Sequence, residues 1–254
     1  MAAPIRAGRR TCLGGEARDM IRLLLGLGAY LVPLVAIAAT IALDVGHYQD
    51  EPGAISARGR PELEFNLDLA RAIETALGTR GYATRLIGAD GGMRDLWRRP
   101  RAARGADLFI SVHHDSTREK FLAAWTYEGA ERRYSDRFAG FSLFVSRANH
   151  GWKKALRCAS AIGAVLVKAG FRPSLYHADP VVGENRPFAD KANGVHYFDH
   201  LAVLRHATMP ALLFEAGVIV NREEELRMRD SLIQRQIAVR VAEGVDACLK
   251  KSDE

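Results

Sequence analysis

Short apolar runs alternate with segments of helical periodicity from residue 40 onward, and this alternation restricts the fold more than any other feature of the chain. The apolar runs predict buried strands, because each is short and nearly free of charge. They cover residues 40–46, 83–87, 107–113, 141–146 and 211–215. Between or after them, apolar residues recur at helical spacing over 63–77 and 153–168, and we also predict helices over an arginine-rich stretch at 94–104 and over 230–249. We therefore predict an α/β layered domain with a largely parallel or mixed sheet.

A charge-free apolar run covers residues 23–39 and follows Arg22. A basic flank, an apolar centre and small residues at the end are typical of a secretory signal. We interpret residues 1–39 as a leader and predict export to the periplasm, with membrane contact only through a leader that stays uncleaved. A buried core helix and an uncleaved anchor are the alternative interpretations, and Met20 is an alternative start to Met1.

The net charge of +6 does not indicate a nucleic-acid partner. Half of it comes from five arginines against two acidic residues within residues 1–38, and the rest of the chain holds 31 basic and 28 acidic residues without a basic stripe. Two of the three cysteines, Cys158 and Cys248, lie beyond the leader. In an oxidising compartment they could form a disulfide or remain two buried thiols on neighbouring helices, and the sequence leaves both options open.

Reactive side chains stand where three predicted strands end. His47 follows the first strand, His113 ends the third and Glu215 ends the fifth, while Glu62 opens the helix after the first strand. Because ligands of open α/β sheets bind beyond the carboxyl ends of the strands, we expect these four side chains to converge. Two imidazoles and a carboxylate suit a catalytic zinc ion, and a second carboxylate can move protons. Taken singly, each residue could instead be a hydrogen-bonded or ion-paired structural group.

Four segments of the chain, in order, resemble the zinc-dependent N-acetylmuramoyl-L-alanine amidases of the bacterial cell-separation type. They are LDVGH at 43–47, GRPE at 59–62 with Asn66, ADLFISVH at 106–113 and PALLFEAG at 210–217. The resemblance extends over about residues 40–250.

The resemblance implies one zinc ion held by His47, Glu62 and His113, with Glu215 as general base and then general acid. It implies hydrolysis of the amide between the lactyl group of N-acetylmuramic acid and the L-alanine of peptidoglycan stem peptides, in wall remodelling or cell separation. It also implies that residues 40–254 form a single αβα domain around a twisted sheet of about six strands.

Neighbouring residues have less direct roles in this interpretation. Glu62 keeps the spacing of the family motif and Glu64 does not, so we interpret Glu64 as a solvated or paired surface residue. Asn66 follows Glu62 by one helical turn and is a candidate support for it. His114 replaces the usual alanine of the motif and should face away from His113, because successive strand residues face opposite sides. Arg99 matches a recurrent family arginine and is a candidate substrate contact.

Two segments, 115–139 and 172–199, lack clear periodicity and are long for connections within a compact domain. They are either functional or ordered by short elements of their own. In some relatives an inserted helix covers the zinc until an activator protein displaces it. Either segment could act in this way, and the second contains residues that could take part. Its candidate plug or substrate residues, each of which could equally be a plain surface residue, are His177, Glu184, His196 and His200.

Two other functions are compatible with the same residues. A zinc metallopeptidase that trims stem peptides would use the same donor set, because the constellation serves many amide hydrolases. A non-catalytic wall-binding domain would be expected to have lost a ligand or the base, and the sequence keeps all four residues.

Overall fold

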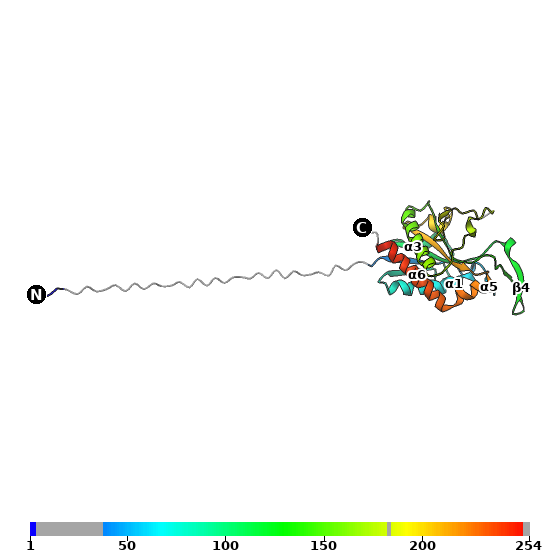
Figure 1. Ribbon diagram of the computed structural model, residues 1–254, viewed down its shortest axis with the longest axis horizontal. Coiled ribbons are helices and arrows are strands. Elements are labelled where there is room, and N and C mark those ends of the chain that lie inside the picture. The colour runs from blue at the N-terminus through cyan, green and yellow to red at the C-terminus, as the bar shows by residue number, and fades with distance from the viewer. Residues whose placement is uncertain (4–37, 182–183, 251–254) are drawn as a thin grey trace. The chain divides into compact units, whose positions relative to one another are not determined.

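The computed structural model describes residues 1–3, 38–181 and 184–250 (Figure 1). The chain divides into two units, Met1–Ala36 and Ile37–Glu254, and the second contains every element discussed below. The predicted leader lies almost entirely outside the described residues.

A seven-stranded mixed sheet forms the centre of the second unit. Its strand order is β2-β1-β3-β9-β6-β8-β7. The strands are β1 (Thr40–Val45), β2 (Ala83–Ile87), β3 (Leu108–Asp115), β6 (Ser142–Val145), β7 (Phe188–Asp190), β8 (Val195–Tyr197) and β9 (Ala211–Val218). The first four strands in this order are parallel, β6 runs antiparallel to β9, β8 is parallel to β6, and β7 is antiparallel to β8.

Helices cover both faces of the sheet, so the prediction of a layered α/β fold is confirmed. The long helices α1 (Glu62–Gly78), α3 (Trp152–Lys168) and α6 (Ser231–Leu249) lie together over one face (Figure 1). The short helices α2 (Arg98–Ala102) and α4 (Ala202–Arg205) pack on the other face, and α5 (Arg222–Arg229) precedes α6. Strand alternation divides the core accordingly: Leu43 packs toward α1 and α6, whereas Ala42 packs toward the short helices.

The structure corrects the expected helix over 94–104, because α2 contains only Arg98–Ala102. Proline lacks a backbone N–H and is tolerated only in the first helical turn, so Pro100 restricts how early this helix can begin.

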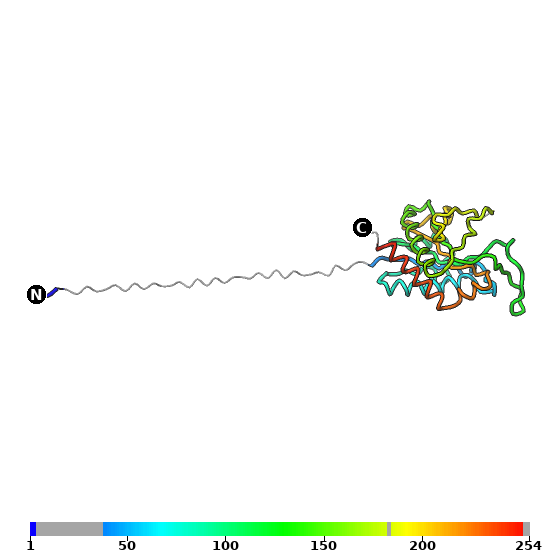
Figure 2. The backbone as a smooth tube through the Cα atoms, in the orientation of Figure 1, coloured from blue at the N-terminus to red at the C-terminus, as the bar shows by residue number. Residues whose placement is uncertain are grey.

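The two segments without periodicity contain short elements. Residues 115–139 form a 3₁₀ turn (Glu119–Phe121) and a separate hairpin of β4 (Ala123–Tyr127) and β5 (Ala130–Tyr134). This hairpin projects beyond the main sheet (Figure 2). Residues 172–199 form a 3₁₀ turn (Tyr176–Ala178) and the edge strands β8 and β7. Together with the five strands that the apolar runs predicted, these two edge strands make the sheet seven-stranded.

A disulfide between Cys158 and Cys248 joins α3 to α6, with the two Cα atoms 4.9 Å apart. It resolves the alternative that the sequence left open. Among the described residues, no helix combines the length and apolarity needed to cross a membrane.

Candidate active site

His47 lies just beyond the carboxyl end of β1, in a backbone conformation that few side chains adopt. Its φ is +70°. The neighbouring carbonyls are held by Arg99, which is 1% exposed and donates to the carbonyls of Val45, at 2.5 Å, and of His47. Asp44 in β1 pairs with the Arg99 guanidinium at 2.7 Å. The arginine that the sequence offered as a substrate contact is thus buried, and it fixes the loop that presents His47.

His113 and Glu215 lie side by side on adjacent parallel strands. Residue 113 of β3 is the register partner of residue 215 of β9, so both side chains project from the same face near the carboxyl ends of the strands. β3 continues to Asp115, and His114 therefore points to the opposite face. There its Nδ1 lies 2.9 Å from Oδ1 of Asn66, and burial lowers the pKa of His114 to about 3.

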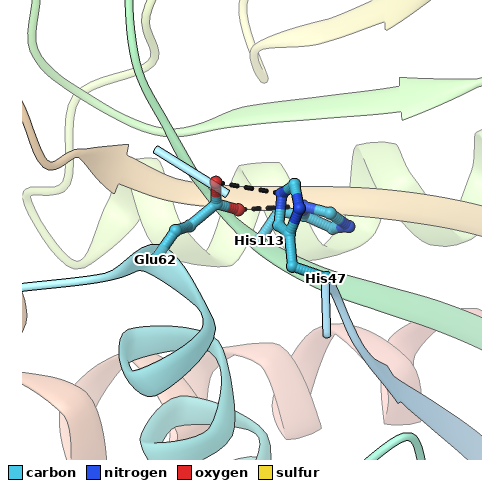
Figure 3. A group of neighbouring side chains, drawn as sticks. All are labelled: His47, Glu62 and His113. Carbon is cyan, nitrogen blue, oxygen red and sulfur yellow. Dashed lines mark hydrogen bonds and ion pairs between the residues drawn. The ribbon is translucent and has the colours of Figure 1, made fainter. Parts of the chain in front are cut away.

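Glu62, the first residue of α1, faces both histidines with its carboxylate (Figure 3). Its Oε2 is 3.0 Å from His47 Nε2, and its Oε1 is 3.0 Å from His113 Nδ1. One donor atom from each of the three residues lies within 4.8 Å of the others. In the part of the chain that the structure describes, no other group of three or more His, Cys, Asp or Glu side chains is clustered in this way. The three side chains could therefore hold one metal ion.

The Glu62 carboxylate is buried and fully engaged. Burial opposes its charge, but hydrogen bonds from His113 and His47 outweigh burial and hold the pKa of Glu62 well below its usual range. The Ala54 amide donates to Oε2 at 3.0 Å, and the Asn66 side-chain amide donates to Oε1 at 3.1 Å. The carboxylate is thus kept ionised and oriented, as a metal ligand must be.

Glu64, the neighbouring carboxylate, takes no part in the cluster. Its side chain is 57% exposed and pairs with Arg60 at 2.8 Å. It is a paired surface residue, as the motif spacing predicts.

Glu215 lines a cavity of about 300 Å³ together with residues of β6 and of the segment 172–199. Its Oε2 atom is buried and has no hydrogen-bond partner among the described residues. Burial, together with the nearby carboxylates of Asp115 and Glu62, raises the pKa of Glu215 well above its usual value. A carboxyl group with a raised pKa can be both base and acid at moderate pH.

The segment 172–199 contributes a buried polar network instead of a side chain in the His–Glu–His cluster. His177 Nε2 lies 2.8 Å from Asp115 and its Nδ1 lies 2.8 Å from Glu184. The Tyr176 hydroxyl donates to Asp115 at 2.9 Å, and Arg186 pairs with Glu184. His196 is buried between aromatic rings, and His200 is exposed.

Sequence reasoning missed Asp115 and Tyr176. The one available signal was that Asp115 follows the end of the predicted strand that carries His113 by two residues.

The site combines two histidines and a glutamate at the carboxyl edge of an α/β sheet with a buried carboxyl group on the adjacent strand. This arrangement is typical of metal-dependent hydrolases. Comparison with known proteins narrows this class. Residues 41–247 match the family model described as N-acetylmuramoyl-L-alanine amidase. The chain belongs to this family.

Individual relatives agree with the family assignment. The chain is 27% identical over 218 residues to the N-acetylmuramoyl-L-alanine amidase AmiA of Escherichia coli. The aligned region covers 81% of this chain and 74% of AmiA. Among solved structures, the amidase Ami1 of Mycobacterium smegmatis has a TM-score of 0.67 at 18% identity, covering 84% of this chain and 97% of Ami1. The CwlD amidase of Clostridioides difficile, solved in complex with the GerS lipoprotein, has a TM-score of 0.61 at 17% identity, covering 84% and 99%.

Proposed function

We propose that this protein is a zinc-dependent enzyme that hydrolyses the amide between the lactyl group of N-acetylmuramic acid and L-alanine in peptidoglycan stems. Membership in the amidase family supports the bond that is cleaved. The observation that carries the proposal is the clustering of His47, Glu62 and His113 beside Glu215, four residues brought together from distant parts of the chain.

The residues fit a zinc ion by their chemistry and by the space around them. Two imidazoles and one carboxylate are a common protein donor set of catalytic zinc, whose remaining position is open to water. The backbone approaches the cluster so closely that a Cβ atom at Gly46 would lie 2.2 Å from His113 Nε2. A Cβ atom at Gly53 would lie 2.4 Å from Glu62 Oε2. Bound zinc would polarise the amide carbonyl and lower the pKa of water toward ~7.

Glu215 is positioned to move the proton that the reaction requires. Its ionised form accepts a proton from the attacking water, and its protonated form delivers that proton to the leaving nitrogen of L-alanine. The raised pKa keeps the protonated form accessible at the moment of delivery. Meanwhile Asn66 and the Ala54 amide hold Glu62 in place through direct hydrogen bonds.

We further propose that the enzyme acts outside the cytoplasm, in the periplasm, because its substrate is the cell wall. The basic flank and apolar run within residues 1–39 support export by a secretory leader. The roles that follow are wall remodelling or cell separation. An activator protein is a further proposed partner, and the complex of CwlD with GerS shows that one structurally similar amidase binds another protein.

Mass mapping of the products tests the proposed bond. Purified protein is incubated with intact peptidoglycan, and the released material is separated and sequenced by mass. We expect peptides with L-alanine at the amino terminus and glycan strands with free lactyl carboxyl groups. Fragments cut inside the stem peptide, with the lactyl–alanine amide intact, would instead indicate a stem-trimming metallopeptidase and contradict the proposal.

A further inference from the structure

Two cavities are lined by residues of the candidate active site. The first, of about 300 Å³, is lined by Glu215 and is called here the Glu215 cavity. The second, of about 280 Å³, is lined by His47 and His113 and is called here the His47 cavity. Because Glu215 lines only the first of the two, the cavities are chemically distinct and can receive different halves of a substrate.

The Glu215 cavity has one apolar wall and one polar wall. Phe144, Phe198 and Leu213 supply apolar surface, and Ser116, Thr117 and Arg118 follow β3 on the polar side. This combination suits a short peptide, whose methyl groups need apolar contact and whose carbonyl and carboxyl oxygens need donors.

Three buried polar atoms that line this cavity have no hydrogen-bond partner in the described part of the chain. They are Thr117 Oγ1, Arg118 Nε and Glu215 Oε2. A buried donor without an acceptor is costly, and such donors are usually satisfied by protein, water or ligand. The polar wall of the Glu215 cavity therefore offers unused donors close to the residue that moves the proton.

Arg118 is the cation of this wall that is least committed to a carboxylate of the protein. Its Nε lies 3.6 Å from Glu184, beyond hydrogen-bonding distance, and its side chain is 37% exposed. Glu184 is already engaged by His177 and Arg186, and Asp115 is engaged by Tyr176 and His177. Arg118 can thus turn to a ligand carboxylate without leaving a protein carboxylate unpaired.

The direction of proton transfer assigns the two halves of the substrate. Glu215 must touch the nitrogen that leaves, so the released peptide lies on the Glu215 side of the cluster and the lactyl–glycan half lies in the His47 cavity. In a stem that begins with L-alanine and γ-linked D-glutamate, the free α-carboxylate of D-glutamate follows that nitrogen by a few covalent bonds.

We propose that Arg118 pairs with this α-carboxylate and makes the enzyme selective for stems in which it is free over stems in which it is amidated. The inference rests on the proposed function and adds the recognition of the second stem residue. Charge-assisted hydrogen bonds are directional and are lost when the carboxylate becomes a neutral amide.

A competition between two substrates tests the proposal. Disaccharide–tripeptides that differ only in D-glutamate or D-isoglutamine at the second position are mixed in equal amounts with the full-length enzyme, and the released peptides are counted by mass. We expect the free acid to be released with about tenfold higher kcat/KM, as befits one charge-assisted hydrogen bond. Arg118→Ala should reduce the ratio to about one, and Arg118→Lys should retain part of it.

Arg133→Ala is the matched control, because Arg133 lies on the hairpin, pairs with Glu119 and does not line the Glu215 cavity. It should keep the selectivity of the unmodified enzyme. The unmodified enzyme could release L-alanyl peptides from intact peptidoglycan and yet act on the two disaccharide–tripeptides at equal rates. That result would overturn the inference about Arg118 and leave the proposed function standing. Failure to release L-alanyl peptides from either kind of substrate would overturn the proposed function and the inference with it.

Discussion

Glu62 is the residue of the cluster whose carboxylate contacts both histidines. One oxygen faces each imidazole at 3.0 Å, and backbone and side-chain amides hold the carboxylate from behind. Donors on a carboxylate fix its orientation and hence the geometry available to a metal. At the scale of residues, metal binding at this site therefore depends on a charged carboxylate at position 62.

Replacing Glu62 by glutamine tests that dependence. We expect Glu62→Gln to weaken zinc binding at least about tenfold, because the neutral amide is a poor ligand and one of its ends can only donate. Glu64→Gln is the matched control, since Glu64 lies on the same helix, pairs with Arg60 and is outside the cluster. Zinc affinity is measured by competition with a chelator. Equal affinity in both variants would contradict the ligand role of Glu62.

At the scale of elements, the loops after β1 bring glycine backbone against the cluster. Gly46 approaches the His113 ring closely, and Gly53, at φ +81°, approaches both Glu62 and His47. A glycine at such a position allows a close approach that a side chain would block.

Gly46→Ala should therefore damage the site without changing any donor. The added Cβ would lie 2.2 Å from His113 Nε2, so the ring must move, and we expect zinc affinity to fall about tenfold or more. Gly78→Ala is the control, because a Cβ there would have no heavy atom within 4 Å apart from the adjoining residues and the backbone of its own helix. Unchanged zinc affinity in Gly46→Ala, measured by chelator competition, would show that the ring tolerates the methyl group and would refute the close-approach argument.

The disulfide between α3 and α6 gives a second prediction at this scale. It closes a loop with a sequence separation of 90. We expect Cys158→Ala/Cys248→Ala to lower the free energy of unfolding by about 2–4 kcal/mol in urea denaturation. Reductant should destabilise the unmodified protein similarly and leave the double variant unaffected. If reductant left the urea unfolding midpoint of the unmodified protein unchanged, a stabilising role for the disulfide would be ruled out.

At the scale of the whole molecule, the segment 172–199 is joined to β3, which carries His113, by the network of His177, Asp115 and Glu184. Burial opposes the charge of His177, but Asp115 and Glu184 outweigh burial and raise its pKa above 6.5. A group whose pKa is raised by folding contributes stability that is fully present below its unfolded-state pKa and is lost as pH rises through the folded-state value.

Stability should thus fall as pH rises from about 6.5 through the raised pKa of His177. His177→Gln should remove this part of the decline, whereas His150→Gln, at an exposed position, should not. Urea denaturation across the pH range measures the effect. An identical pH dependence in the unmodified protein and His177→Gln would contradict the charged network.

The layered fold was predictable because local periodicity encodes strands and helices, and the rule that ligands bind at the carboxyl ends of strands indicated which residues to examine together. Glu62 could be distinguished from Glu64 by motif spacing. The role of Arg99 was not predictable, because its partner Asp44 lies 55 residues away and the pairing depends on a buried contact. The strands β7 and β8 were missed because each has only three residues, too few to show a period.

We propose that one metal ion at His47, Glu62 and His113 works together with Glu215. The direct measurement is a zinc titration of metal-free protein that follows bound zinc and release of L-alanyl peptides from peptidoglycan in the same samples, with Glu215→Gln beside the unmodified enzyme. We predict that activity saturates at one zinc per chain, and that Glu215→Gln binds the same zinc but loses at least about a hundredfold in rate. Full activity without metal, or full activity in Glu215→Gln, would contradict the account.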